Sequence, residues 1–283
     1  MNVRRIVAAR TVSRACRYAL LGGHGLLVLF PMLWLLTTSL KDTWSIFKDP
    51  WKLPETLQWV NYSKAWISGG LGWKFWNSMV VDLVALTVIL LVAAMAAYAL
   101  ARFKFPGNRV IYYLFLSGMA LPVFLAIVPL FMLMTDLHLL NTRVGLITIY
   151  VAYMLSFPIF ILYGFFKTLP GELAEAALID GCTPFGVFWR VMLPLAKPGL
   201  VTAGIFVFIG LWNEYPLALV FLSKGELQTL PVGIASLTMT QRYQADWGAL
   251  FAALTISVIP TVFFYTLFQR QIQAGLTAGA VKG

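Results

Sequence analysis

Residues 83–101 read LVALTVILLVAAMAAYALA, a run of 19 residues without a charged side chain. A helix of about 20 apolar residues crosses the hydrocarbon core of a bilayer. The other membrane architecture, a β-barrel, needs strands of about 10 residues in which polar and apolar side chains alternate. This run does not alternate, and lipid offers no partner to exposed backbone groups, so the run is predicted to be a transmembrane helix.

Similar stretches recur along the chain. Glu214 interrupts one of them, but residues 215–223 are again uncharged, so this stretch is interpreted as a single span that contains a carboxylate. We therefore expect an all-α membrane protein with six membrane-spanning helices, at about residues 18–40, 78–101, 110–134, 144–166, 198–222 and 247–269. Together they form a transmembrane domain over residues 18–269.

Composition excludes the soluble classes of protein. Hydrophobic residues make up 60% of the chain and charged residues 11%, whereas soluble domains carry about 45–50% and about 25%. A soluble enzyme or a disordered chain is therefore not expected. The net charge of +10 is assigned to loops that stay in the cytoplasm, and no nucleic-acid partner is predicted.

The distribution of lysine and arginine predicts the orientation. With six spans both termini share one side, which would hold thirteen of these residues, against eight on the other side. Positive charge marks the cytoplasmic side. We expect a multi-pass protein of the cytoplasmic (inner) membrane with both termini in the cytoplasm.

Both terminal segments have their own predictions. In the N-terminal amphipathic segment, residues 1–17, Arg10, Arg14 and Arg17 lie along one helical face, which is typical of a surface helix at the cytoplasmic leaflet. The cytoplasmic tail, residues 270–283, is rich in glycine and is not expected to form a stable helix alone.

The outer loop and the prolines complete the organisation. Six tryptophans in residues 41–76 indicate either an interfacial belt or a docking surface for an external partner. Pro122, Pro158 and Pro260 lie inside spans and are expected to kink them.

Catalytic and metal chemistry is not predicted. Cys16 and Cys182 are interpreted as free thiols. The only histidines, His24 and His138, allow no catalytic triad, and His24 is expected to form a hydrogen bond between helices. No cluster has metal-ligand spacing, and there is no G-x-x-x-x-G-K-[ST] phosphate loop. The chain is therefore expected to bind no cofactor, and any ATP must be used by a partner.

The cytoplasmic loop of residues 167–197 is too long to be a simple connection, since helix connections in bundles usually take 2–8 residues. The sequence of this loop predicts two short helices. The first spans Glu172–Asp180 and ends at Gly181, where a left-handed conformation belongs. Thr183, followed by proline, starts the second helix, and Pro194 is expected to stop it.

One face of the first short helix is nearly flat. Leu173, Ala176, Ala177 and Asp180 follow one another at spacings of three, one and three. Small residues with a carboxylate at the edge favour close docking against another protein. An amphipathic helix lying on the bilayer is an equally good interpretation from these residues alone.

The same loop resembles the EAA loop of the ABC importer permeases, because it contains Glu175-Ala176-Ala177, then Asp180-Gly181, then Leu193-Pro194. The resemblance extends along nearly the whole chain to the sugar-importer permeases of the maltose type. Further matching segments, in the order of that family, are Asn61-Tyr62, Asn77-Ser78, residues 96–102, Trp212-Asn213-Glu214, Gln269-Arg270 and the glycine-rich ending.

The resemblance implies a type I importer permease fold in which residues 172–180 form a coupling helix. Glu175 would pair with a basic group of a separate ATPase, the alanines would permit close approach, and Gly181 would permit the turn. The implied coupling residues are Glu172, Glu175, Ala176, Ala177, Asp180, Gly181, Leu193 and Pro194. The implied partners are two copies of an ATPase that uses ATP and Mg, a second and different permease, and an extracytoplasmic sugar-binding protein.

A solute path needs polar groups within the spans, and ionisable residues there are functional candidates by default. The candidates are Trp212, Asn213, Glu214, Tyr215 and Asp82. Amides, carboxylates and aromatic faces together suit a sugar. The segment around Glu214 equally allows a role in bending the helix or fastening it to a neighbour, and Asp82 is expected at interface depth, partly wet, or in a gate.

Two other functions compete with an ATP-driven sugar importer. A proton-coupled secondary transporter could relay protons through Asp82 and Glu214, but no internal repeat supports it and the structured cytoplasmic loop is unexplained. A membrane scaffold without a solute path would leave Glu214 unexplained.

Overall fold

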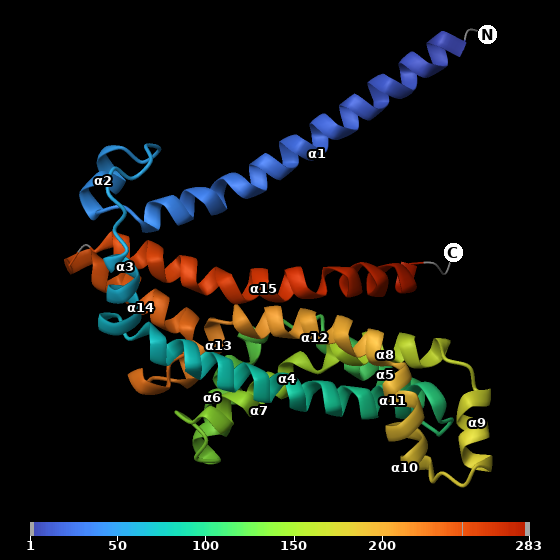
Figure 1. Cartoon of the computed structure of the whole chain (residues 1–283). Coiled ribbons are helices and arrows are strands. Elements are labelled where there is room, and N and C mark those ends of the chain that lie inside the picture. Colours follow the sequence, from blue (N-terminus) through green and yellow to red (C-terminus); the bar gives the residue numbers. More distant parts are fainter. Residues whose placement is uncertain (1–2, 245, 281–283) are drawn as a thin grey trace. The chain divides into compact units, whose positions relative to one another are not determined.

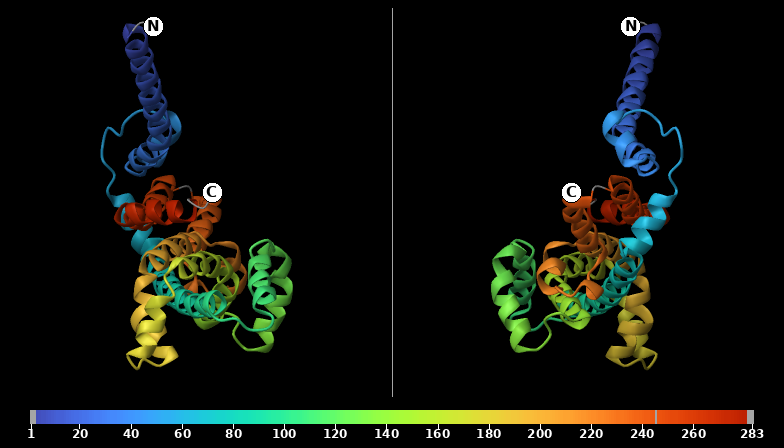
Figure 2. Two further views of the ribbon diagram at one scale, coloured as in Figure 1. Left: turned by 90° about the vertical axis from the view of Figure 1, so that its right-hand side faces the viewer. Right: turned by 90° about the vertical axis from the view of Figure 1, so that its left-hand side faces the viewer.

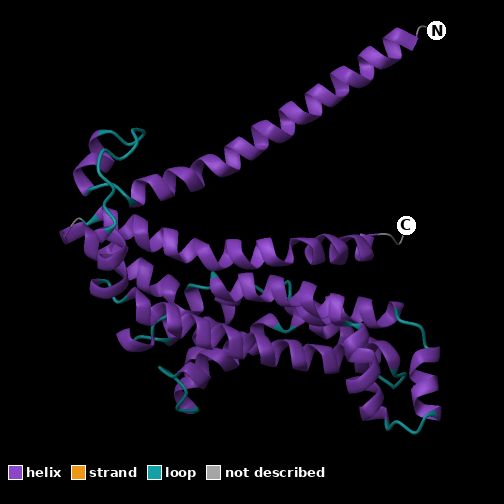
Figure 3. Cartoon of the chain, in the orientation of Figure 1, coloured by secondary structure: helices purple, strands orange, loops and turns teal. Residues whose placement is uncertain are grey.

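The computed structural model describes residues 3–244 and 246–280, with side chains described except at 3–13, 15, 240–244, 270 and 272–280. All regular elements of this described part are helices, as predicted (Figure 3). They form two compact units: unit 1 comprises residues 1–71 and 236–256, and unit 2 comprises residues 72–235 and 257–283.

Unit 1 contains the N-terminal helix and the outer loop that follows it (Figure 1). Its elements are α1 (Val3–Ser39), α2 (Thr43–Lys48), α3 (Val60–Ser63), the π-helical η1 (Lys64–Ser68) and parts of α14 (Leu230–Gln244) and α15 (Trp247–Ala280). The buried amide of Asn61 donates to the carbonyls of Ser39 at 2.9 Å and Lys41 at 2.8 Å, which fixes the turn after α1. Gly248 lies against this amide, where a Cβ atom would come within 2.5 Å of Nδ2.

Replacing Asn61 by leucine is expected to destabilise unit 1. The carbonyls of Ser39 and Lys41 would lose their buried donor, and each unsatisfied group costs about 1–3 kcal/mol. Thermal unfolding of the purified protein in detergent checks this. A matched Gln58→Leu change, in which an exposed amide loses one bond to Thr56, is expected to shift the midpoint by less than 2 °C. Equal shifts for both variants would contradict the role of Asn61.

Unit 2 contains the remaining helices. They are α4 (Leu71–Arg102, from its second residue), α5 (Asn108–Gly118), α6 (Val123–Asp136), α7 (Arg143–Met154), α8 (Ser156–Thr168), α9 (Glu172–Ile179), α10 (Pro184–Val187), the π-helical η2 (Phe188–Met192), α11 (Leu193–Leu195), α12 (Lys197–Trp212), α13 (Pro216–Phe221) and η3 (Gly225–Leu227). α8 packs along α12 and α5. Both views in Figure 2 show α5 and α6 at the side of unit 2.

The described part of the chain has three candidate spans, or six if each bent helix pair is counted as one span, and the last of these pairs, Pro184–Leu195 with Lys197–Trp212, differs from the predicted span 198–222. Three helical segments are individually long and apolar enough to cross a membrane, namely Cys16–Ser39, Leu71–Arg102 and Trp247–Gln269. Three helix pairs pass the same test together, with bends of 99° between α5 and α6, 49° between α7 and α8, and 73° where α12 follows the helix that ends at Leu195.

Two of the three predicted proline kinks coincide with bends. Pro122 immediately precedes α6, at the 99° bend, and Pro158 is the third residue of α8, just after the 49° bend. Proline removes a helical N–H and crowds the preceding turn, which explains both breaks. Pro260 lies inside α15, which continues past it without a break, so the kink predicted at this residue stays a prediction.

Both terminal segments continue long helices. α1 runs without a break from Val3 to Ser39, so residues 3–17 are part of that helix, and the side chain of Arg10 lies outside the described residues; the location of this segment at the cytoplasmic leaflet stays a prediction. The tail is helical to Ala280 because it continues α15. Extending a formed helix avoids the cost of nucleation, which the tail would bear if it were alone.

Two further predictions concern exposed side chains. His24 is exposed, so the predicted hydrogen bond to another helix is not made within the described part of this chain. Trp44, Trp51, Trp59 and Trp73 in the outer loop are exposed, which leaves them accessible to lipid headgroups or to a partner.

Candidate functional site

The fifth predicted span is interrupted between α12 and α13. α12 ends at Trp212 and α13 begins at Pro216, which has no N–H to donate to the carbonyl four residues earlier. The carboxylate of Glu214 caps the new helix, because Oε1 accepts from the backbone of Leu217 at 2.7 Å and Oε2 from that of Ala218 at 3.0 Å.

Glu214 also joins this break to α7. The Tyr150 hydroxyl donates to Glu214 Oε2 at 2.7 Å, and the Tyr150 side chain is fully buried. Both carboxylate oxygens are thus occupied by groups of the same chain. These contacts favour the fastening interpretation of Glu214 over direct binding of a sugar.

Tyr150 was not among the predicted site residues. Its only signal in the sequence is a hydroxyl within an apolar run, and buried tyrosine hydroxyls usually find a partner. The sequence does not say which partner, because Tyr150 and Glu214 are 64 positions apart.

Asp82 is more buried within the protein than predicted. α4 begins at Leu71, eleven residues before Asp82, which places Asp82 about 16 Å along the helix at 1.5 Å per residue. The side chain is only 1% exposed, so the expected partly wet position is wrong. Its Oδ2 has no hydrogen-bond partner among the described residues, and its carboxyl group is close enough to Glu214 for the two to interact electrostatically.

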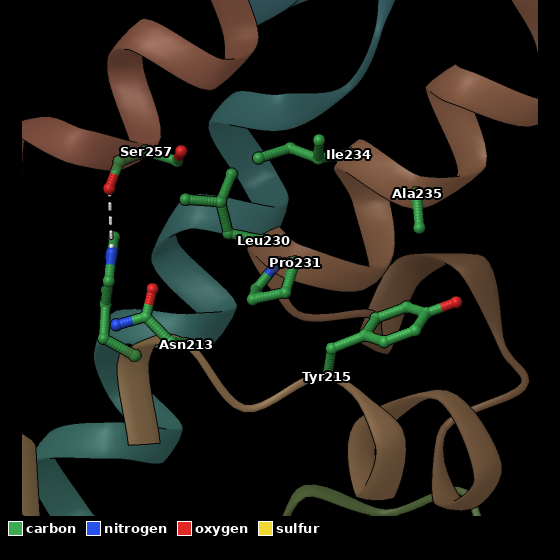
Figure 4. A pocket seen from close by; sticks show the side chains of 8 residues that line it. Asn213, Tyr215, Leu230, Pro231, Ile234, Ala235 and Ser257 are labelled. Carbon is green, nitrogen blue, oxygen red and sulfur yellow. Dashed lines mark hydrogen bonds between the residues drawn. The ribbon is translucent and has the colours of Figure 1, made fainter. Parts of the chain in front are cut away.

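A cavity of about 300 Å³ lies beside the break (Figure 4). Its lining residues are Trp212, Asn213, Tyr215, Leu230, Pro231, Ile234, Ala235 and Ser257. The structure therefore brings together three of the predicted path residues, Trp212, Asn213 and Tyr215. Glu214 and Asp82 do not line it.

Trp212 serves the packing of this region. It is 2% exposed, its indole N–H donates to the Ser257 carbonyl at 2.9 Å, and its ring stacks on Phe208 with centroids 5.9 Å apart. Asn213, in contrast, is exposed, and Tyr215 is half-buried. Together with Ser257, these two side chains supply hydrogen-bonding groups to the cavity.

The cytoplasmic loop is built largely as predicted. Gly181 has φ 85°, the left-handed conformation expected after α9, and the Thr183 side chain accepts from the backbone of Gly186 at 3.1 Å. Pro194 does not stop the second helix, which continues to Leu195. The π-helical segment η2 precedes it, and such a shift in hydrogen bonding accommodates a proline inside a helix.

α9 divides the two alanines between its faces. Ala177 is 8% exposed and belongs to a buried cluster with Val187 and Phe188, so it packs the loop internally and does not face outward as expected. The outward stripe consists of Glu172, Glu175, Ala176 and Ile179, at the spacing of one helical face. Ile179 is 86% exposed, which is unusual for so large an apolar side chain.

The other predicted coupling residues have mixed environments. Asp180, Gly181 and Pro194 are exposed, and Leu193 is half-buried against the cluster that holds Ala177. The exposed members of the predicted coupling residues therefore extend from α9 to the end of the second helix of the cytoplasmic loop.

The loop is anchored to the spans. Tyr98 of α4 lies 5.4 Å from Phe166 of α8 and 5.1 Å from Phe188 of η2, measured between ring centroids. Arg102, at the end of α4, donates from Nη2 to the carbonyl of Leu169, where the loop begins. The loop is thus packed against the ends of both α4 and α8.

Replacing Arg102 by methionine is expected to loosen this anchor. The variant keeps the aliphatic stem and loses the bond to Leu169, so we expect solute uptake per ATP hydrolysed to fall about three- to ten-fold with assembly intact. Uptake and hydrolysis measured in the same reconstituted vesicles check this. Arg109→Met, at an exposed position on α5, is the matched control, and equal ratios for the two variants would contradict the anchor.

In the described part of the chain, neither metal-ligating side chains nor the two cysteines form a further functional site. Among the described residues, no group of three or more His, Cys, Asp and Glu side chains has the arrangement to hold a metal ion. Cys16 is exposed and Cys182 is half-buried, and both are free thiols, as predicted.

Comparison with known proteins assigns the architecture. Residues 89–277 match the family model described as the binding-protein-dependent transport system inner membrane component. The chain belongs to this family. As a member of it, the chain is a membrane permease component of an ABC importer, which works with an ATPase and a binding protein.

Individual relatives of this permease agree with the family. It is 44% identical to the diacetylchitobiose uptake system permease protein NgcG of Streptomyces coelicolor over 95% of this chain and 89% of that one. It is 38% identical to the trehalose transport system permease protein SugB of Mycobacterium tuberculosis, over 90% and 93%.

A solved structure supports the fold of the permease. A chain of a bacterial ABC transporter involved in the import of the acidic polysaccharide alginate matches with a TM-score of 0.79, 23% identity and coverage of 93% and 97%. The type I importer permease fold implied by the loop motif is thus confirmed.

Proposed function

We propose that this permease conducts a sugar, as one of two different permease chains in an importer driven by two ATPase subunits. The observation that carries the sugar assignment is the 44% identity, over 95% of the chain, to a diacetylchitobiose uptake permease. The cavity at the α12–α13 break supports it, because neutral hydrogen-bonding groups and apolar faces line it together.

The ATPase would dock on the outward stripe of α9, with Glu175 paired to a basic group and Ile179 inserted as an apolar anchor. ATP and Mg would be bound by that partner alone. Both termini would lie in the cytoplasm, on the side of α9, as the distribution of lysine and arginine predicts.

A second permease would cover the exposed apolar residues of α5 and α6. No residue of α5 is buried, and Phe124, Leu125 and Val128 of α6 are more than 60% exposed. A different chain is proposed, and not a second copy, because the family resemblance of the sequence favours such a pair.

Purification in mild detergent, with co-purifying chains identified by mass spectrometry, tests the proposal. We expect an ATPase, a second permease and ATP-dependent uptake of labelled diacetylchitobiose or trehalose after reconstitution with the binding protein. Uptake of sugar by the chain alone, down a proton gradient, would overturn it.

A further inference from the structure

Two carboxyl groups of unit 2, those of Glu214 and Asp82, are close enough to interact but have different surroundings. Glu214 accepts three hydrogen bonds. The Tyr150 hydroxyl donates to Oε2 at 2.7 Å, and the backbone N–H groups of Leu217 and Ala218 donate at 2.7 and 3.0 Å. Donors that converge on a carboxyl group stabilise its ionised form. Glu214 therefore carries the negative charge of this pair.

Asp82 has no comparable support. Its side chain is 1% exposed, and its Oδ2 is buried without a hydrogen-bond partner among the described residues. The Tyr150 hydroxyl has a single proton to donate and gives it to Glu214. The ion pairs of the described residues lie in unit 1, so no cation there offsets a charge on Asp82.

The surroundings of Asp82 are apolar apart from its charged neighbour. Val81 and Ala85, on either side of it in α4, belong to a buried hydrophobic cluster that also contains Tyr150. The titratable groups that interact with Asp82 from the elements packed here are Glu214 at the break and Tyr150 of α7. Ionised Asp82 would add a second negative charge beside Glu214, and burying a carboxylate without a partner is strongly unfavourable.

We infer that Asp82 and Glu214 together bind one proton and that this proton resides on Asp82. The neutral carboxyl group lets α4 pack against the break between α12 and α13, while Glu214 keeps the charge that caps α13. Loss of the proton at alkaline pH would place two like charges side by side and release the break from α4. The proton is a structural ligand, which neither accompanies a solute nor supplies energy for transport.

Infrared spectroscopy of the full-length chain, purified in detergent, tests where the proton lies. A protonated carboxyl group has a C=O stretching band that a carboxylate lacks. At neutral pH we expect this band in wild type, its loss in Asp82→Asn, and its persistence in Glu214→Gln. Asp136→Asn, which removes an exposed carboxyl group, is the matched control and should keep the band. A band that is absent from wild type, retained in Asp82→Asn or lost in Glu214→Gln would overturn the inference.

The pH dependence of thermal unfolding is a second measurement. Native Asp82 keeps a proton that an aspartate of the unfolded chain releases above about pH 4. The stability of the native state therefore falls as the pH rises, until native Asp82 itself ionises. Between about pH 6 and pH 8, the midpoint of wild type should fall by about 2–4 °C per pH unit more than that of Asp82→Asn. Asp136→Asn should keep the wild-type slope.

Each remaining outcome of these measurements bears on the proton site. Equal slopes for wild type and Asp82→Asn would overturn it. Asparagine has the shape and the neutrality of the protonated acid, so failure of Asp82→Asn to fold would contradict the site as well. A lack of sugar uptake by wild type would instead count against the proposed function, because neither measurement uses transport.

Discussion

Glu175→Arg is expected to remove the ATPase from the purified assembly while the second permease stays bound. Glu175 lies in the middle of the outward stripe of α9, and its side chain is exposed, so reversal of its charge leaves the packing of the loop intact. Breaking a hydrogen-bonded charge pair at an interface costs about 2–5 kcal/mol. At 1.4 kcal/mol per factor of ten, affinity falls about 30-fold to 4,000-fold, and transport is lost.

The ratio of ATPase to permease, measured by quantitative mass spectrometry after purification, checks this expectation. Glu226→Arg is the matched control, because it reverses another exposed carboxylate on the far side of the predicted membrane. A wild-type ratio for Glu175→Arg would show that the stripe on α9 is not the contact.

Substitutions at the neighbouring residues Ala176 and Ala177 distinguish an effect on ATPase docking from an effect on folding. Ala176→Trp places a large side chain on the exposed stripe, so it should reduce ATPase binding with little effect on stability. Ala177→Trp forces the same volume into the cluster with Val187 and Phe188, and overpacking typically costs about 1–3 kcal/mol. Thermal unfolding in detergent should therefore distinguish two adjacent substitutions of the same kind.

Glu214→Leu is expected to give the largest loss of stability in unit 2. It leaves the Tyr150 hydroxyl and the N–H groups of Leu217 and Ala218 without their acceptor. At about 1–3 kcal/mol for each of these three unsatisfied buried groups, the sum is about 3–9 kcal/mol. For a chain of this size the unfolding midpoint should fall by about 10 °C or more.

Asp82→Asn is the matched control for this substitution. It neutralises the neighbouring carboxyl group, but its Oδ2 has no hydrogen bond to lose among the described residues. We therefore expect an unfolding midpoint within 2 °C of wild type, or higher. A decrease as large as that of Glu214→Leu would contradict the assignment of the cap to Glu214.

A double-mutant cycle isolates the bond between Glu214 and Tyr150. Glu214→Gln, Tyr150→Phe and the double variant should give a coupling free energy of about 1–2 kcal/mol, near the upper end of values for hydrogen bonds within membranes. Additive effects of the two substitutions would show that the hydroxyl and the carboxylate do not stabilise each other.

Local chemistry explains what could be predicted about the fold. Long uncharged runs can satisfy their backbone groups only as helices in lipid, so the helical class and the six spans follow from composition and length. The end of α9 just before Gly181 and the start of α10 just after Thr183 depend on neighbours within four residues. Such short-range requirements are visible in a sequence.

The helix ends and the candidate site were less predictable. α4 starts at Leu71 because charged and aromatic residues, such as Lys74, are accepted in a helix that extends beyond the apolar run. The burial of Asp82 depends on helices that are distant in the chain, so its exposed fraction could not be predicted from its neighbours. The choice between a solute ligand and a structural cap for Glu214 depends on where Tyr150 lies, which no local pattern contains.

The sequence by itself determined that this protein is a helical membrane permease with a structured loop that contains the EAA motif, since hydrophobicity, turn residues and this motif are properties of neighbouring positions. Only the tertiary structure decided that Ala177 faces inward and Ile179 outward, that Glu214 fastens α13 to α7, and that Asn213 and Tyr215 share a cavity. Side-chain burial and hydrogen-bond partners are decided by residues distant in the chain, and their positions follow from how the helices pack.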